Sequence, residues 1–208
     1  MRNILRIFAL IGAICSAQAQ GTSEAVSSYT LPAAAGFLSG TGGWAFKPNI
    51  NMAVTNLGCL QYLVSGPNGQ GNMQVGLWAN GGQLLASASI ASTNPLLNFT
   101  LYAAINQVFL NAGSTYVVGI YSPSGSVLLN LVTQGVDGSA TLSPDLQLLG
   151  SATGTPGFVY PGSVSANNTL LLGPNFQYRP VVPEPSALAL LSLGGVGWAV
   201  RRKTRRNV

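Results

Sequence analysis

The side chains that could do chemistry are few in this sequence. The chain has 208 residues and no histidine, which excludes every His-dependent nucleophile pair and every His-ligated metal site. The carboxylates between residues 20 and 182 are Glu24, Asp137 and Asp145. Glycoside hydrolysis requires two carboxyl groups on either side of a sugar bond. Glu24 lies in a segment rich in small residues, and neighbouring Gly and Pro residues place the two aspartates at turns. We therefore expect no catalytic site and no enzyme activity.

Groups that bind metals or phosphates are equally scarce. The sequence has no Asp-rich loop of the EF-hand type, and the glycine-rich run at residues 40–43 lacks the Lys-Ser/Thr pair of a phosphate-binding loop. We expect no metal and no cofactor. Cys59 stands between Gly58 and Leu60, and this apolar context favours a buried, inert thiol over a reactive or interchain one.

Charged residues are concentrated at the two ends of the chain. Only 6% of residues are charged and the net charge is +5, whereas ordinary soluble proteins are about 25% charged. Between residues 20 and 182 the basic residues are Lys47 and Arg179, too few to neutralise phosphates, so we exclude nucleic acid as a partner. Asn, Gln, Ser and Thr supply the polar surface. Such a surface suits an inert exported protein, and it also suits hydrogen bonding to neutral sugars.

The amino-terminal segment has the pattern of a secretory signal. Two arginines precede an apolar run over residues 7–15. The triplet Ala17-Gln18-Ala19 follows, and its two alanines are the small residues that signal peptidase accepts. We predict cleavage between Ala19 and Gln20, so that residues 1–19 form a signal peptide.

The carboxyl-terminal segment, residues 181–208, has three parts in order. Pro183, Glu184 and Pro185 form a stiff, extended leader because proline fixes its own φ and restricts the preceding residue. An apolar segment at 187–200 follows; as a helix it would extend about 21 Å, against a bilayer core of about 30 Å. A basic cluster follows at 201–206, which comprises Arg201, Arg202, Lys203, Arg205 and Arg206. We expect a marginally long transmembrane helix that this cluster orients; the alternative is a short core helix.

This tail resembles the PEP-CTERM sorting signal. The resemblance rests on the Pro183-Glu184-Pro185 triplet, the apolar segment with its glycine-rich stretch at 194–197, and the basic cluster at the end. It implies processing by an exosortase, a membrane cysteine transpeptidase-like enzyme of exopolysaccharide-producing Gram-negative bacteria. It also implies that the triplet is the recognition and cleavage region, and that the tail holds the protein in the inner membrane until processing. These residues are then a substrate site of another enzyme.

The middle of the chain reads as short strands separated by turns. The Asn80-Gly81-Gly82 run indicates a hairpin, and Ser122-Pro123-Ser124-Gly125 a further turn. The expected strands are Trp44–Phe46, Met52–Leu57, Cys59–Ser65, Met73–Ala79, Leu84–Ile90, Asn98–Tyr102, Gln107–Leu110, Thr115–Tyr121, Val127–Thr133, Ala140–Leu148, Gly157–Tyr160 and Thr169–Tyr178. We predict an all-β fold, an antiparallel β-sandwich of jelly-roll or Greek-key type at residues 43–180. A flexible leader at 20–42 would precede it.

The segment from Gly43 to Tyr121 is also similar to a β-sandwich module that often accompanies PEP-CTERM tails and has no assigned activity. The segments that match the module are Gly43-Trp44-Ala45-Phe46, Val54-Thr55-Asn56-Leu57-Gly58, Val75-Gly76-Leu77-Trp78, Leu84-Leu85-Ala86-Ser87 and residues 110–119. The Gly66–Asn72 loop departs from the module's pattern, and the similarity fades after Tyr121.

These observations predict an exported, exosortase-sorted, non-catalytic protein of the cell envelope or extracellular matrix. It would be anchored transiently in the inner membrane of a Gram-negative bacterium, with signal peptidase and exosortase as its processing enzymes. The alternative is a carbohydrate-binding module for the cell's own exopolysaccharide. Seven aromatic residues could stack on sugars if exposed, although core positions are the stronger expectation: Trp44, Trp78, Tyr62, Tyr102, Tyr116, Tyr121 and Tyr160.

Overall fold

The computed structural model describes residues 21–30, 36–65, 71–124, 127–133, 140–166 and 169–181; for residues 36–37 and 127–133 it describes the backbone alone. The described chain is all-β, and its strand pairs are antiparallel. This confirms that the fold is all-β with antiparallel sheets, as predicted. The predicted signal peptide and the apolar carboxyl-terminal helix lie outside the described residues.

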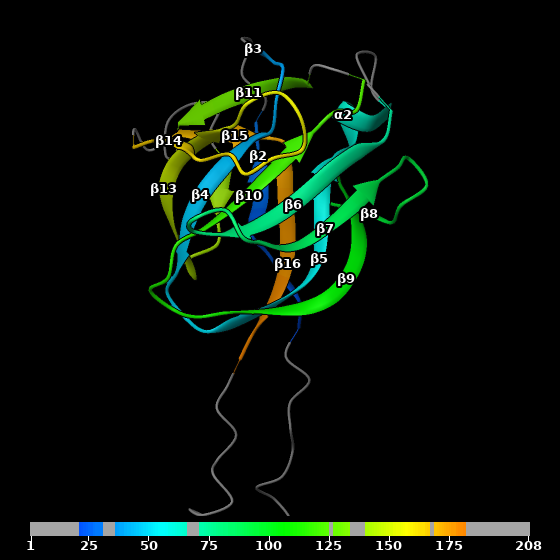
Figure 1. Cartoon of the computed structure of the whole chain (residues 1–208). Coiled ribbons are helices and arrows are strands. Elements are labelled where there is room, and N and C mark those ends of the chain that lie inside the picture. Colours follow the sequence, from blue (N-terminus) through cyan, green and yellow to red (C-terminus); the bar gives the residue numbers. More distant parts are fainter. Residues whose placement is uncertain are drawn as a thin grey trace, which may run out of the picture.

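Two large sheets form most of the domain (Figure 1). The five-stranded sheet has the order β1-β16-β5-β9-β8, with strands at Ser23–Glu24, Pro174–Pro180, Met52–Leu60, Thr100–Leu110 and Leu96–Leu97. The six-stranded sheet has the order β14-β13-β4-β10-β6-β7, with strands at Ser163–Ser165, Leu146–Thr153, Gly42–Pro48, Tyr116–Tyr121, Met73–Ala79 and Leu84–Ile90.

Smaller elements complete the fold. A three-stranded sheet has the order β15-β11-β3 (Thr169–Leu172, Val127–Thr133, Gly36–Leu38), and a two-stranded sheet pairs β12 (Ala140–Leu142) with β2 (Val26–Tyr29). The helix α2 spans Gln61–Ser65 and buries Leu63 and Val64. No helix in the described ranges is long and apolar enough to cross a membrane.

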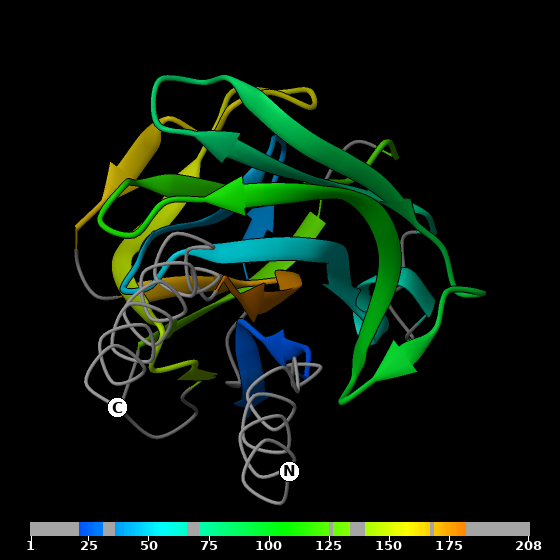
Figure 2. The same ribbon diagram turned by 90° about the horizontal axis from the view of Figure 1, so that it is seen from below.

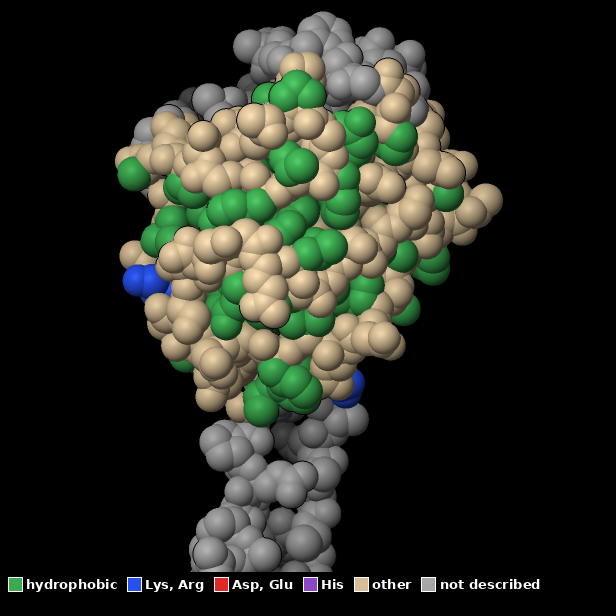
Figure 3. Space-filling model, in the orientation of Figure 1, with side chains coloured by type: hydrophobic (Ala, Val, Ile, Leu, Met, Phe, Trp, Pro, Cys, Tyr) green, Lys and Arg blue, Asp and Glu red, His purple; other side chains and the backbone are tan. Residues whose placement is uncertain are grey.

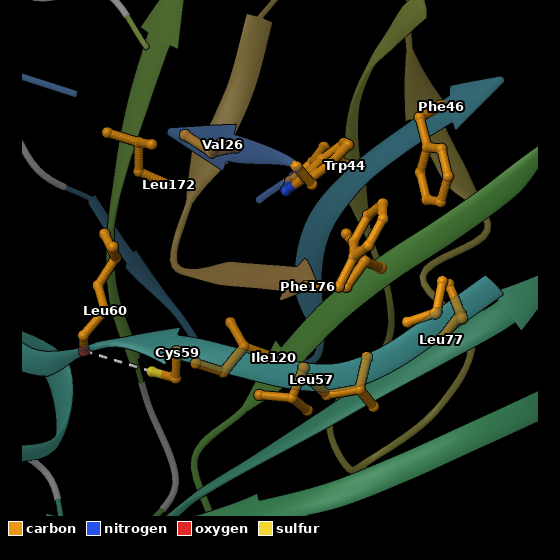
Figure 4. Packing of buried hydrophobic residues seen from close by; sticks show 14 of the residues in the cluster. Val26, Trp44, Phe46, Leu57, Cys59, Leu60, Leu77, Ile120, Leu172 and Phe176 are labelled. Atoms are coloured by element: carbon orange, nitrogen blue, oxygen red, sulfur yellow. Dashed lines mark hydrogen bonds between the residues drawn. The ribbon is translucent and has the colours of Figure 1, made fainter. Parts of the chain in front are cut away.

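The main core contains aromatic side chains from both large sheets (Figure 4). The ring of Phe176 on β16 lies 5.8 Å from that of Trp44 and 5.0 Å from that of Phe46, both on β4. The indole Nε1–H of Trp44 donates to the carbonyl of Pro174 at 3.1 Å, which satisfies its polar atom inside the core. Burial of these large rings away from water supplies the main driving force for joining the sheets.

The outer face of the six-stranded sheet is covered as well. β4 is buried at nearly every position, so it shows no alternation of buried and exposed side chains. Ala45, Val117 and Ala152 form a second small core on this side, with Tyr160 packed against it. The expected strand Gly157–Tyr160 is wrong: these residues are a loop whose polar groups bond to Thr41, and Phe158 packs on Trp78 at 5.3 Å.

Several expected strands are confirmed, namely Met73–Ala79, Leu84–Ile90 and Val127–Thr133. The hairpin at Gly81 and Gly82 is also confirmed, since both have positive φ, 96° and 97°. The expected strand Cys59–Ser65 is wrong beyond Leu60, because helix α2 places Leu63 and Val64 in the core. The break between the strands expected at Asn98–Tyr102 and Gln107–Leu110 is absent, since β9 is a single strand over Thr100–Leu110. Its pairing with β5 shifts register between Val54 and Asn56.

The flexible leader expected at residues 20–42 is wrong for the parts that form β1, β2 and β3. β1 pairs with β16, β2 with β12 and β3 with β11. Figure 2 shows the blue amino-terminal strands beside the orange β16, with β5 and β9 beyond it. The sequence interpretation took the small residues of this segment as a sign of flexibility. Edge strands can nevertheless be short and polar when a neighbouring strand supplies their hydrogen bonds.

Candidate functional site

The last strand of the domain leads directly into the carboxyl-terminal segment. β16 lies between β1 and β5 and ends at Pro180, opposite Met52. The backbone N–H of Val181 still donates to the carbonyl of Asn51, at 2.8 Å. Val182 alone separates this anchored residue from Pro183 in the sequence. The predicted sorting triplet therefore follows an ordered, hydrogen-bonded strand with almost no intervening chain.

The amino-terminal strand lies beside the same exit point. Ser23 is opposite Tyr178 and Glu24 is opposite Gln177. Because the pairing is antiparallel, the start of β1 and the end of β16 lie at the same end of the sheet. The predicted mature amino terminus, at Gln20, thus comes three residues before β1. β1 in turn pairs with β16, the strand that precedes the tail.

Glu24 belongs to a hydrogen-bonded network on the outer face of the five-stranded sheet. Its carboxylate accepts from the hydroxyl of Tyr102 at 2.7 Å and from the amide of Asn98 at 2.6 Å. The amide of Asn175 in turn donates to the same Tyr102 hydroxyl at 2.9 Å. Burial, followed by the hydrogen bond and charge of Glu24, raises the pKa of Tyr102. The Glu24 carboxylate and the Tyr102 hydroxyl are therefore held in a fixed structural arrangement.

The Tyr102 ring lies against the backbone of Gly58 on the neighbouring strand, because glycine has no side chain there. A Cβ atom at Gly58 would lie 2.5 Å from two carbons of that ring. Tyr102 and Asn175 are the cross-strand partners of Gly58 on either side. This glycine, near the end of β5, is thus required for the hydrogen-bonded network that holds β1.

A pocket of about 520 Å³ lies next to this network. Its floor includes Asn56 on β5 and Gln177 on β16, which are cross-strand partners. Ala104 on β9 is the partner of Asn56 on the other side. Asn56 and Gln177 alternate along their strands with the core residues Leu57 and Phe176, so the pocket opens on the outer face of the sheet. The residues that line it are Asn56, Asn94, Pro95, Leu97, Tyr102, Ala103, Ala104 and Gln177.

Comparison with known protein families decides the nature of the carboxyl-terminal segment. Residues 181–203 match the family model described as the PEP-CTERM protein-sorting motif. The chain carries a PEP-CTERM sorting motif. The motif indicates an exported protein that is processed by an exosortase at the membrane on its way to the cell surface. No curated protein matches the chain.

The PEP-CTERM motif begins at Val181, the residue that is hydrogen-bonded beside the end of β16. The predicted processing residues Pro183, Glu184 and Pro185 fall within the matched range but outside the described residues, as do Arg201, Arg202 and Lys203. Arg205 and Arg206 follow the matched range. The predicted signal-cleavage residues Ala17, Ala19 and Gln20 likewise lie outside the described residues. The roles assigned to all these residues stay predictions.

Asp145 has a structural partner on β16. The hydroxyl of Tyr178 on β16 donates to the Asp145 carboxylate at 2.8 Å and also bonds to the Ser143 hydroxyl. Burial and the Asp145 carboxylate raise the pKa of Tyr178 to about 12. Asp137 lies outside the described residues. In the described ranges, no three His, Cys, Asp or Glu residues lie close enough together to hold a metal ion.

The aromatic residues singled out from the sequence mostly belong to the interior. Trp44, Trp78, Tyr102 and Tyr116 are buried, which favours the core interpretation for these four. The other three, Tyr62, Tyr121 and Tyr160, are partly exposed.

Cys59 is fully buried, as expected from its sequence context, and its Sγ–H donates to the carbonyl of Leu60 at 3.4 Å (Figure 4). Burial raises the pKa of its thiol. The thiolate, which is the reactive form of cysteine, is therefore disfavoured.

The pocket is the functional candidate that sequence reasoning missed. Its lining comes from strands that are distant in sequence, β5, β9 and β16, together with the loop before β8. The sequence signal was a pair of polar residues, Asn56 and Gln177, each next to a large apolar residue of its strand, Leu57 and Phe176. That signal becomes interpretable only once the register places the two residues side by side.

Proposed function

We propose that this protein is a non-catalytic component of the cell envelope or extracellular matrix, delivered by exosortase processing. Its domain would be an antiparallel β-sandwich of jelly-roll or Greek-key type. The observation that carries the proposal is the PEP-CTERM motif at 181–203, which follows directly after β16. Export, retention through the tail and cutting near Glu184 then occur in sequence, and the folded domain is the product.

The non-catalytic assignment is supported by the state of the described carboxylates. Glu24 and Asp145 each accept a hydrogen bond from a tyrosine hydroxyl, and each has a role in holding two strands together. The whole chain lacks histidine. A panel of glycan and ester substrates should give no turnover. Turnover that Asp137→Asn or Asp145→Asn abolished would overturn this assignment.

Sorting is tested by cell fractionation with a size assay, in hosts with and without an exosortase. The unchanged protein should lose its tail only in the exosortase-positive host. Glu184→Ala should block this processing and leave the protein bound to the membrane. Identical tail loss in both hosts would contradict the proposal.

The basic cluster is tested separately. Replacement of Arg201, Arg202, Lys203, Arg205 and Arg206 by Ser should weaken membrane retention, because these charges fix the orientation of the apolar segment. Arg179→Ser is the matched control, since this exposed cation lies on β16 just before the motif. The control should be retained as well as the unchanged protein; equal leakage from both variants would contradict a role for the cluster.

A second candidate function is carbohydrate binding, with the cell's own exopolysaccharide as the ligand. It is favoured by one feature, the uncharged pocket on the five-stranded sheet. The one face of the domain that Figure 3 shows has mostly neutral side chains, with few basic groups and no acidic ones in view. Binding to a glycan array would test this candidate, and the absence of any bound glycan would remove it.

A further inference from the structure

We propose that the pocket on the five-stranded sheet binds one unit of a neutral saccharide, with the side-chain amides of Asn56 and Gln177 binding its hydroxyl groups. This inference rests on the second candidate function and supplies its site. It is carried by three properties of the pocket: unengaged amides, an apolar wall and the absence of charge in the lining.

The two amides are available for a ligand. Neither Asn56 nor Gln177 makes a side-chain hydrogen bond, whereas the third amide of the lining, Asn94, is engaged. Both are partly exposed and stand next to each other across β5 and β16. An amide offers two donors and one acceptor oxygen. A pair of them can therefore bind adjacent hydroxyl groups, each of which both donates and accepts.

The opposite side of the pocket is apolar. Pro95 and Leu97 lie before and on β8, and Ala104 adds a small side chain from β9. Leu97 is 46% exposed. A pyranose ring has C–H groups that pack against such a wall while its hydroxyls face the amides. The volume of about 520 Å³ falls within the range of small-molecule sites, about 300–1,000 Å³.

The wall is held in place by hydrogen bonds to β9. The N–H of Tyr102 donates to the carbonyl of Pro95 at 2.9 Å. The Asn94 side chain accepts from the N–H of Ala91 at 2.7 Å and donates to the carbonyl of Tyr102 at 3.3 Å. A pocket whose shape is fixed before binding loses less conformational entropy when the ligand arrives.

The charge pattern selects a neutral ligand over an anionic one. No charged side chain is among the residues that line the pocket. Glu24 is the cross-strand partner of Gln177 and so continues the row of side chains beyond it. Its negative charge would repel a uronic acid or sulfated sugar at that end. An extended peptide is a weaker candidate, because the edge strand β8 has only two residues with which to pair.

The test uses isothermal titration calorimetry with neutral oligosaccharides (glucan, mannan and galactan fragments), alginate fragments as the anionic comparison, and an extended neutral peptide. Asn56→Ala and Gln177→Ala should each weaken binding of the neutral oligosaccharide about five- to tenfold, as expected for a lost hydrogen bond. Ala104→Leu should abolish it, because position 104 is exposed and a larger side chain fills the pocket without disturbing the core. Gln147→Ala is the matched control, an exposed glutamine on β13 of the other large sheet.

The outcomes separate the site from the function. If the unchanged protein binds a neutral oligosaccharide and the three pocket variants bind it equally well, this site is wrong while carbohydrate binding stands. If the unchanged protein binds no oligosaccharide, carbohydrate binding itself is wrong. Preferential binding of alginate or of the peptide would overturn the ligand class. Melting temperatures of the variants close to that of the unchanged protein exclude misfolding as the cause of any loss.

Discussion

The side-chain amide of Asn175 pairs with the backbone of Val26 as a neighbouring strand would. Its Oδ1 accepts from the N–H of Val26 at 3.0 Å, and its Nδ2 donates to the carbonyl of Val26 at 2.9 Å. The same amide also bonds to the hydroxyl of Tyr102 and to the N–H of Phe176. One buried side chain near the start of β16 thus fastens the amino-terminal strands to the strand that precedes the sorting motif.

Replacement of Asn175 by Ala should therefore destabilise the domain by about 2–3 kcal/mol, because several buried partners lose their hydrogen bonds at once. Urea unfolding measures the change in the free energy of unfolding. Gln147→Ala should change it by less than about 0.5 kcal/mol, as is usual for an exposed position. An Asn175→Ala variant as stable as this control would show that the amino-terminal strands are held by other contacts.

Gly43 should tolerate no side chain. A Cβ atom there would lie 1.9 Å from the carbonyl oxygen of Val118 on the neighbouring strand β10, so one of the two backbones would have to move. We expect Gly43→Ala to cost more than about 3 kcal/mol or to prevent folding. Gly21→Ala, where a Cβ meets no atom within 4 Å, should leave thermal unfolding unchanged. Similar melting temperatures for both variants would contradict the close approach of β4 and β10.

The turn between β8 and β9 should gain stability from a glycine. Asn98 and Phe99 have φ values of 44° and 71°, as in a type I′ hairpin turn, whose second central position favours Gly. Phe99 is 70% exposed and contacts the Tyr29 ring edge-on at 6.2 Å. The backbone strain of a positive φ at Phe99 should cost more free energy than the exposed contact with Tyr29 contributes. Phe99→Gly should therefore raise the free energy of unfolding by about 0.5–1 kcal/mol.

Phe109 supplies the matched control for that turn. It is 65% exposed but lies within β9, where glycine adds only chain entropy to the unfolded state. Phe109→Gly should therefore destabilise by about 0.5–1 kcal/mol. Changes of the same sign in calorimetric melting of the two variants would contradict the strain assigned to Phe99.

Stability should fall in the alkaline range. Burial, with the Asp145 carboxylate as a further cause, raises the pKa of Tyr178 from an ordinary value of 10.0 to about 12. The folded protein thus holds the phenol proton more tightly than the unfolded chain does. The resulting stabilisation is complete below about pH 10 and is lost as the pH rises to about 12. Urea midpoints measured from pH 8 to 12 should decline across this window.

Tyr178→Phe tests the assignment to this residue. The variant should be less stable than the unchanged protein at pH 8, because the bonds to Asp145 and Ser143 are lost. Its decline between pH 10 and 12 should be shallower. The remaining slope comes from Tyr102, Cys59 and Tyr29, whose pKa values are also raised, chiefly by burial. An unchanged slope in the variant would assign the alkaline transition to other groups.

The fold class and the sorting tail could be predicted because both depend on local sequence. Hairpin signals such as Gly81-Gly82 fix the direction of the chain through backbone conformations that few other residues adopt. The Pro-Glu-Pro triplet, apolar segment and basic end act as a linear signal, and the matched motif at 181–203 confirms its presence. Neither conclusion requires knowledge of which strands are neighbours.

The role of residues 21–42 and the location of the pocket required the tertiary structure. Ser23 and Glu24 form a strand only because β16, about 150 residues later in the chain, presents free backbone groups beside them. Asn56 and Gln177 become one site only through the register of β5 and β16. Pairing between strands distant in sequence leaves no local pattern, since each strand's sequence reports how it is buried and not which strand it lies against.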